Sequence, residues 1–257
     1  MIMAIPGANS ATATIDQPMD WYPGVVTRIE TLSPRVKSFF FRLPKALAFR
    51  PGQHVLVRLT APDGYRAQRS YSIASAPSLS EELELTIERL ADGEVSPFLH
   101  DVVEPGDEIE LGGPIGDHFV WDPADGKSAL LIGGGTGVVP FLSMLRQRAA
   151  IASHVPVTLV FSARTRADLL FHDELSRLTS SDSDVNFIAT LTRETSAPGF
   201  RTGRIDAALI AHAISEMNEP ARQVLICGSN PFVETATEGA LVAGIDSTKI
   251  KTERYGV

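Results

Sequence analysis

The chain has 257 residues, of which 44% are hydrophobic and 21% charged, and its formal net charge is -8. This length and composition are typical of one large or two ordinary globular domains. No apolar run approaches the roughly 18 residues of a membrane span, and no secretory signal opens the chain. We therefore expect a soluble, cytoplasmic protein with no membrane, nucleic-acid or metal partner. The single cysteine, Cys227, excludes an internal disulfide and an iron–sulfur cluster held by four cysteines of this chain.

The first half of the chain has the pattern of a small β-barrel. Residues 1–20 are rich in Ala, Thr and Ser and predict a flexible tail. Short strands separated by Pro and Gly turns are then predicted at 24–31, 36–43, 54–60, 66–74 and 83–90. A short helix is predicted at 95–101. Several short strands at this spacing indicate an antiparallel barrel.

After a turn at 123–126 the rhythm changes to alternating strands and helices. The predicted strands are 129–132, 157–162, 185–191, 223–227 and 249–254. The predicted helices are 137–150, 168–178, 205–214 and 232–243. This alternation predicts a doubly wound parallel sheet, which binds its ligand at the carboxyl ends of the strands.

Charge is unevenly distributed along the chain. Residues 21–70 contain nine Lys or Arg against two acids, whereas residues 71–257 contain 14 bases against 27 acids. The basic stretch is a candidate surface for an acidic partner. Protection of exposed strand edges is the alternative explanation.

A glycine-rich stretch follows the strand predicted at 129–132, and it contains Gly134, Gly135, Thr136 and Gly137. Glycine permits sharp turns and close approach to a pyrophosphate, and the next helix favours negative charge at its N-terminus. The match to the dinucleotide fingerprint is incomplete, because Val138 stands where a third glycine is expected.

Four motifs occur in order: Arg69-Ser-Tyr-Ser72, Gly93-Glu-Val-Ser96, the glycine loop and Cys227-Gly-Ser-Asn-Pro-Phe232. Together they resemble the ferredoxin–NADP reductase superfamily. The resemblance implies an antiparallel FAD-binding β-barrel over 21–123, then a doubly wound parallel sheet for NAD(P) over 124–257, without an iron–sulfur domain.

The first two motifs have chemistry suited to a flavin. An arginine fork holds phosphate, a tyrosine ring stacks on the flavin, and a serine hydroxyl reaches its N5 edge. The resemblance assigns the flavin to Arg69, Ser70, Tyr71, Ser72, Ile73, Ala74, Ser75, Gly93, Glu94, Val95, Ser96 and Tyr255. Ordinary strand polarity and a helix cap are the alternatives for these motifs, and FMN is the alternative to FAD.

The resemblance assigns the coenzyme to Gly134, Gly135, Thr136, Gly137, Ser162, Arg164, Arg166, Cys227 and Gly228. Two arginines after the strand at 157–162 favour the 2′-phosphate of NADPH, with NADH possible. Stacking on adenine or capping of the next helix is the alternative role for them.

Hydride transfer needs only that two rings be positioned and water excluded. The resemblance implies that Ser72, Cys227 and Glu253 converge where the two domains meet, and that Tyr255 covers the flavin. A buried, purely hydrophobic Cys227 is the alternative.

The expected function is FAD-dependent transfer of electrons from NAD(P)H to a protein acceptor, namely an acidic ferredoxin or flavodoxin or an oxygenase component. A reductase of free flavin and a non-catalytic electron-transfer subunit are the alternatives.

Overall fold

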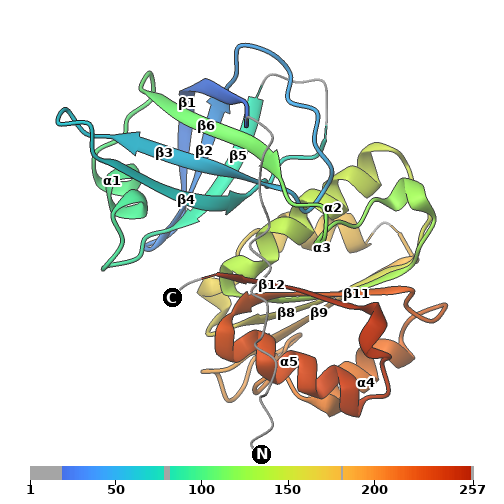
Figure 1. Ribbon diagram of the computed structural model, residues 1–257. Helices are drawn as coiled ribbons and strands as arrows, with labels where there is room; N and C mark the ends of the chain where they lie inside the picture. The colour runs from blue at the N-terminus through green and yellow to red at the C-terminus, as the bar shows by residue number, and fades with distance from the viewer. Residues whose placement is uncertain (1–18, 78–81, 181, 256–257) are drawn as a thin grey trace, which may run out of the picture.

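The computed structural model describes residues 19–77, 82–180 and 182–255. An antiparallel sheet from the first half of the chain lies above a parallel sheet from the second half in Figure 1. The predicted tail lies outside the described residues, apart from Met19 and Asp20. We retain 21–123 and 124–257 as proposed domain boundaries.

The antiparallel sheet closes into a barrel. Its strands are β1 (Trp21–Ser33), β2 (Val36–Arg42), β3 (His54–Thr60), β4 (Arg66–Ser72), β5 (Glu82–Glu88) and β6 (Glu108–Ile115), in the order β4-β3-β6-β1-β2-β5. A bridge between Ile73 and Leu85 joins the two outer strands. The helix α1 (Val95–Asp101), which has its predicted bounds, packs Val95 and Leu99 into the barrel core.

Strand β6 was not predicted, because Gly112, Gly113 and Pro114 are residues that normally interrupt strands. It pairs with both β1 and β3, so it is an interior strand of the barrel. A β-carbon at Gly112 would lie 3.0 Å from the Trp21 ring. Glycine therefore makes room for this tryptophan.

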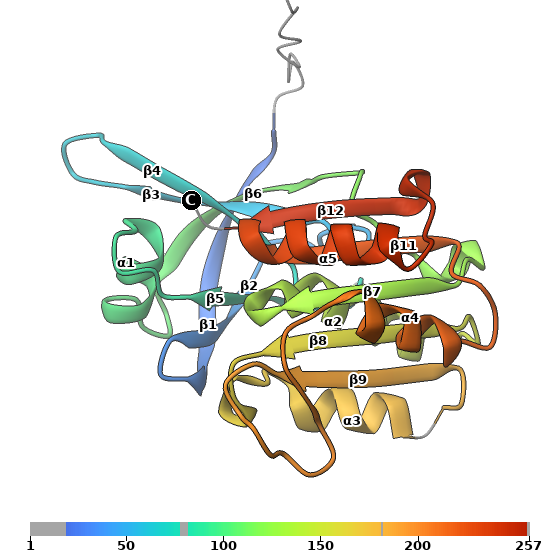
Figure 2. The same ribbon diagram turned by 90° about the horizontal axis from the view of Figure 1, so that it is seen from below.

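The parallel sheet contains β7 (Ala129–Gly134), β8 (Val157–Ala163), β9 (Val185–Leu191), β10 (Arg201–Thr202), β11 (Gln223–Ser229) and β12 (Ile250–Tyr255), in the order β10-β9-β8-β7-β11-β12. Figures 1 and 2 show α2 (Val139–Ala150) and α3 (His172–Ser180) on the face toward the barrel. The helices α4 (Ala207–Ser215) and α5 (Asn230–Val242) cover the other face. This is the doubly wound arrangement that the sequence predicts.

Successive side chains of β7 point to opposite faces of the sheet, so this strand contributes to the apolar core on each face. Leu131 belongs to the cluster that contains α2 residues, whereas Leu130 and Ile132 belong to the cluster beneath α4 and α5. The first cluster also includes Ala74 and Trp121 from the barrel half of the chain. The two halves therefore share one continuous apolar core on the α2 side.

The third helix begins later than predicted, at His172 rather than Asp168. Thr165 and Asp168 form a capping box around the short 3-10 turn η3 (Arg166–Asp168). Phe171 then adopts a φ of 57°, a conformation that interrupts a helix. Among the described residues, no helix is both long and apolar enough to cross a membrane.

Candidate functional site

Strand β4 carries the arginine motif along the barrel. Arg69 and Ser70 are exposed, while Tyr71 and Ser72 are half-buried. Arg69 donates a 2.7 Å hydrogen bond to the carbonyl of Gln68. Its exposed guanidinium has the planar fork that suits a phosphate group.

The second motif lies beside Tyr71. The Ser96 hydroxyl is buried and accepts the Leu90 N–H at 3.1 Å, and a β-carbon at Gly93 would lie 3.2 Å from that hydroxyl. Burial raises the pKa of Tyr71 to about 12, against the opposing effects of the Arg69 charge and a Ser96 hydrogen bond. Arg69, Tyr71, Gly93 and Ser96 therefore lie together, and the cation of the exposed Arg69 and the phenol of the half-buried Tyr71 suit a flavin and its phosphates.

The other two residues of this motif point elsewhere. Val95 is in the barrel core, and the exposed Glu94 accepts the Tyr65 phenol at 2.9 Å. Glu94 is the N-cap of α1 but makes no side-chain capping bond. Any contact of Glu94 or Val95 with a flavin phosphate would therefore be through the backbone.

The segment after Ser72 is held mainly by protein groups. Ile73 and Ala74 are fully buried. The Ile73 and Ala74 amides donate to Gln53 and Glu84 carbonyls, at 3.1 and 2.9 Å. The Ala74 and Ser75 carbonyls accept from side chains of α2. This segment joins the two halves of the molecule, and few of its backbone groups remain for a flavin.

The glycine loop runs from the end of β7 through the 3-10 turn η2 (Gly135–Val138) into α2. Gly135 has a φ of 57°, which favours glycine. A β-carbon at Gly137 would lie 2.2 Å from the carbonyl oxygen of Cys227. Gly137 is therefore needed for the packing of the loop directly against the end of β11.

Phe232 is a site residue that the sequence analysis missed, although its motif was quoted. A β-carbon at Gly134 would lie 2.7 Å from its ring, and one at Gly228 would lie 2.5 Å from it. The ring thus packs against two glycines on neighbouring strands. Its place after Ser229-Asn-Pro, at the start of α5, was the available signal.

Register brings the C-terminal residues beside the glycine loop. Cys227 is paired with Gly133 of β7 on one side and with Glu253 of β12 on the other. The Tyr255 phenol donates a 2.5 Å hydrogen bond to the Gly134 carbonyl, and burial raises its pKa to about 12. Burial, with the nearby Glu253, raises the pKa of Cys227 well above its usual range. The thiol is therefore neutral and packs as a small apolar group.

His54 was not predicted as a site residue, and it links the barrel to the sheet. It is the cross-strand partner of Ser72, and its Nδ1 lies 3.7 Å from Glu253 Oε1. Burial raises the pKa of Glu253 to about 7 and lowers that of His54. Glu253 Oε2 is buried and has no hydrogen-bond partner. Of the three residues proposed as catalytic, Ser72 and Glu253 therefore meet at His54, and Cys227 is the neighbour of Glu253 on the adjacent strand.

The predicted specificity residues lie at the end of β8, which contains Ser162, and just after it. Ser162 is buried, whereas Arg164 and Arg166 are exposed. The Arg166 guanidinium lies 5.3 Å from the Phe200 ring centre, and the Arg166 amide donates to Glu194 Oε1 at 2.5 Å. Glu194 is a carboxylate at this edge that the sequence analysis missed, because it comes after β9, far along the chain.

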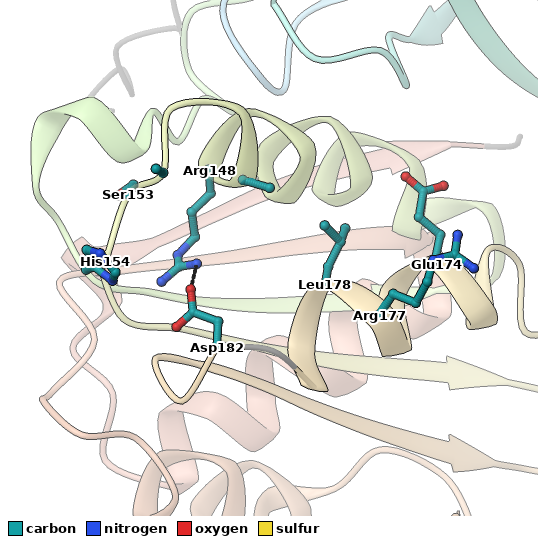
Figure 3. Close-up of a pocket in the computed structure, with 9 residues that line it drawn as sticks. Arg148, Ser153, His154, Glu174, Arg177, Leu178 and Asp182 are labelled. Carbon is teal, nitrogen blue, oxygen red and sulfur yellow. Dashed lines mark hydrogen bonds and ion pairs between the residues drawn. The ribbon is translucent and has the colours of Figure 1, made fainter.

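A separate pocket lies between α2 and α3 (Figure 3). None of its lining residues is in the predicted cofactor set. Arg148 points toward Asp182 there and binds it at 2.6 Å. His154, Asp182 and Asp184 have ligand atoms within 4.8 Å of one another, but Asp182 is already paired with Arg148.

Comparison with known proteins matches each half of the chain to a domain family. Residues 23–120 match the oxidoreductase FAD-binding domain family, and residues 131–238 match the oxidoreductase NAD-binding domain family. The structure resembles the cytochrome P450 reductase GcoB of Amycolatopsis with a TM-score of 0.79 and 25% identity, over 92% of this chain and 70% of that one.

Two curated relatives extend the match. The chain is 34% identical to ferredoxin–NADP reductase B of Sorangium cellulosum, over 88% of this chain and 94% of the relative. It is also 34% identical to the glycine betaine monooxygenase reductase subunit of Chromohalobacter salexigens, over 88% of this chain but only 61% of that protein's length. The chain belongs to the ferredoxin–NADP reductase superfamily of oxidoreductases, with an FAD-binding and an NAD(P)-binding half.

Proposed function

We propose that this protein takes a hydride from NADPH or NADH onto FAD and passes the electrons to a protein acceptor. The observation that carries this proposal is the meeting of the two halves at His54, which pairs with Ser72 and lies 3.7 Å from Glu253. Bound FAD supplies the conversion of a two-electron donor into single electrons. A cytoplasmic location remains part of the proposal.

The chain's own residues position the rings and control protons. The half-buried Glu253 has a pKa of about 7, so it can hold or release a proton near neutral pH. The neutral Cys227 packs beside it and excludes water. Tyr255 lies over the glycine loop through its bond to Gly134, so entry of nicotinamide requires this ring to move.

The proposed acceptor is a ferredoxin, a flavodoxin or an oxygenase component. The near-complete match to ferredoxin–NADP reductase B favours a separate carrier protein. Fewer free positive charges remain on residues 21–70 than the sequence suggests, because four of their arginines are paired with acids. Arg28, Arg35, Arg50 and Arg58 form ion pairs with Glu30, Glu88, Asp125 and Glu110.

Three of those acids lie outside the basic stretch of sequence, so pairing in space cancels part of its charge. Of the bases that remain, Lys37 donates to the His100 carbonyl and Lys45 lies 5.1 Å from the Tyr22 ring centre. We propose that these two, with the exposed Arg42 and Arg66, provide the remaining attraction for an acidic carrier.

NADPH is the proposed preferred coenzyme. Arg164 and Arg166 are exposed at the carboxyl edge of the sheet, where a 2′-phosphate would be held. Asp168 is engaged in the capping box with Thr165, which removes it as a ribose ligand. Glu194 weakens this preference for NADPH. Its carboxylate accepts the Arg166 amide, so it places a negative charge where the 2′-phosphate would bind.

The decisive experiment begins with the absorbance spectrum of the purified protein and the mass of its released cofactor. Anaerobic bleaching by NADPH is compared with bleaching by NADH, and then reduction of an acidic ferredoxin is compared with reduction of free riboflavin across ionic strength. We expect FAD, faster bleaching by NADPH and a salt-dependent ferredoxin step with a salt-independent hydride step. A colourless protein that binds no added flavin contradicts the proposal. Saturation by free riboflavin without ferredoxin reduction indicates a free-flavin reductase.

A further inference from the structure

Arg146, in the middle of α2, joins three parts of the molecule. Its guanidinium binds Glu174 of α3 through Nε and Nη2, at 2.6 and 2.9 Å. Its Nη1 donates to the Ala74 carbonyl at 2.9 Å and to Glu84 Oε2 at 2.5 Å. Ala74 and Glu84 belong to the barrel half, so this one side chain binds both halves.

Glu84 depends on this arginine. It lies on β5 with only 5% of its surface exposed, and its other oxygen accepts the Ser38 hydroxyl at 2.7 Å. A buried carboxylate is costly unless it is paired and hydrogen-bonded. The Glu84 backbone in turn holds the segment after Ser72, because its carbonyl accepts the Ala74 amide and its amide donates to Ser75 Oγ.

A second bond from α2 reaches the same segment. The Ser143 hydroxyl, one turn before Arg146, donates to the Ser75 carbonyl at 2.6 Å. Helix α2 therefore holds two consecutive carbonyls, those of Ala74 and Ser75. The same helix begins directly after the glycine loop. One rigid element thus carries the proposed coenzyme loop at its start and fixes the proposed flavin segment along its length.

We propose that Arg146 is a positioning residue for hydride transfer, which sets the placement of the Tyr71–Ser72 segment relative to the glycine loop. This inference rests on the proposed function. Arg146 is not itself assigned to either cofactor; it binds the carbonyl of Ala74, which is assigned to the flavin, and acts through Ala74 and Glu84. A displacement of about 1 Å between reacting groups can slow a reaction about 100-fold, so a small shift in this link is expected to appear in the rate.

The test compares Arg146→Lys with Arg148→Lys in the flavin-loaded protein. Arg148 is a control arginine on the same helix: its side chain is 4% exposed, against 21% for Arg146, and it binds Val155 and Asp182, both in the sheet half. The measurements are the limiting rate of flavin reduction by NADPH, the NADPH dissociation constant, the long-wavelength absorbance of the flavin–nicotinamide complex, and urea unfolding.

We expect Arg146→Lys to retain flavin and coenzyme affinity, to slow hydride transfer about tenfold or more, and to weaken the long-wavelength absorbance. Ser143→Ala should change the rate in the same direction by less, and Arg148→Lys should lower stability alone. The inference is overturned if Arg146→Lys and Ser143→Ala both reduce their flavin at the rate of the parent protein. It is also overturned if Arg148→Lys slows flavin reduction as much as Arg146→Lys does. Failure of the parent to be reduced by either coenzyme contradicts the proposed function instead.

Discussion

Replacement of Gly137 by alanine tests whether this glycine is needed for strand packing as well as for a ligand. The added β-carbon would lie 2.2 Å from the carbonyl oxygen of Cys227 and 2.6 Å from its carbonyl carbon. Both obstacles are backbone atoms of β11, so the strand or the loop must move. Overpacking usually costs about 1–3 kcal/mol, and a backbone obstacle places Gly137→Ala near the upper end, at about 3 kcal/mol.

Gly134→Ala is the matched comparison in the same loop. Its β-carbon would lie 2.7 Å from the Phe232 ring, which is a side chain and can be made smaller. We expect a loss of about 1 kcal/mol that Phe232→Ala relieves, because the obstructing Cγ and Cδ atoms are then gone, with a coupling energy of about 0.5 kcal/mol or more. The same Phe232→Ala change should not relieve Gly137→Ala, because the Cys227 backbone remains in place.

The assay is equilibrium urea unfolding of the single and double variants in saturating FAD, with the rate of flavin reduction measured in parallel. The flavin dissociation constant is measured for each variant, because at one FAD concentration the contribution of ligand binding to stability is equal only where that constant is unchanged. A Gly137→Ala protein as stable as the parent refutes this reasoning. Equal rescue of both glycine variants by Phe232→Ala refutes it too, since one common cause would then explain both losses.

Three further predictions concern the cofactors and pH. Arg69→Ala should weaken FAD binding by about 1.5–3 kcal/mol, as expected for a hydrogen bond to a charged group, and full affinity in a flavin titration would make Arg69 structural. Glu194→Gln should raise kcat/KM for NADPH relative to NADH, because it removes a carboxylate at the Arg166 amide, and an unchanged ratio would exclude Glu194 from specificity. Burial raises the pKa of Glu253 from 4.5 to about 7, so the folded protein binds the proton more tightly and stability should fall as pH rises from about 4.5 to 7. The fall is at most about 3 kcal/mol, and urea unfolding of Glu253→Gln should lack it; an identical pH profile in both proteins would contradict the assigned shift.

The sequence alone determined the layout of the protein, because strand alternation, turn residues and helix periodicity are local properties. Leu83, Leu85 and Ile87 alternate within β5, and α1 has its predicted bounds. The order of four motifs was sufficient to identify the family. Prediction failed where local signals conflicted. Strand β6 was not predicted because it contains Gly112, Gly113 and Pro114, and α3 begins four residues later than predicted because Phe171 has a φ of 57°.

Only the tertiary structure decided which of these residues meet. His54 and Glu253 are almost 200 residues apart, and no local pattern brings them to 3.7 Å. The basic character of residues 21–70 was likewise a property of the sequence, whereas Glu88, Glu110 and Asp125 neutralise part of it across strands and loops. Residue type determines what a side chain can bind, but its partner depends on how the two sheets pack. That packing is produced by the shared apolar core around α2, to which both halves contribute.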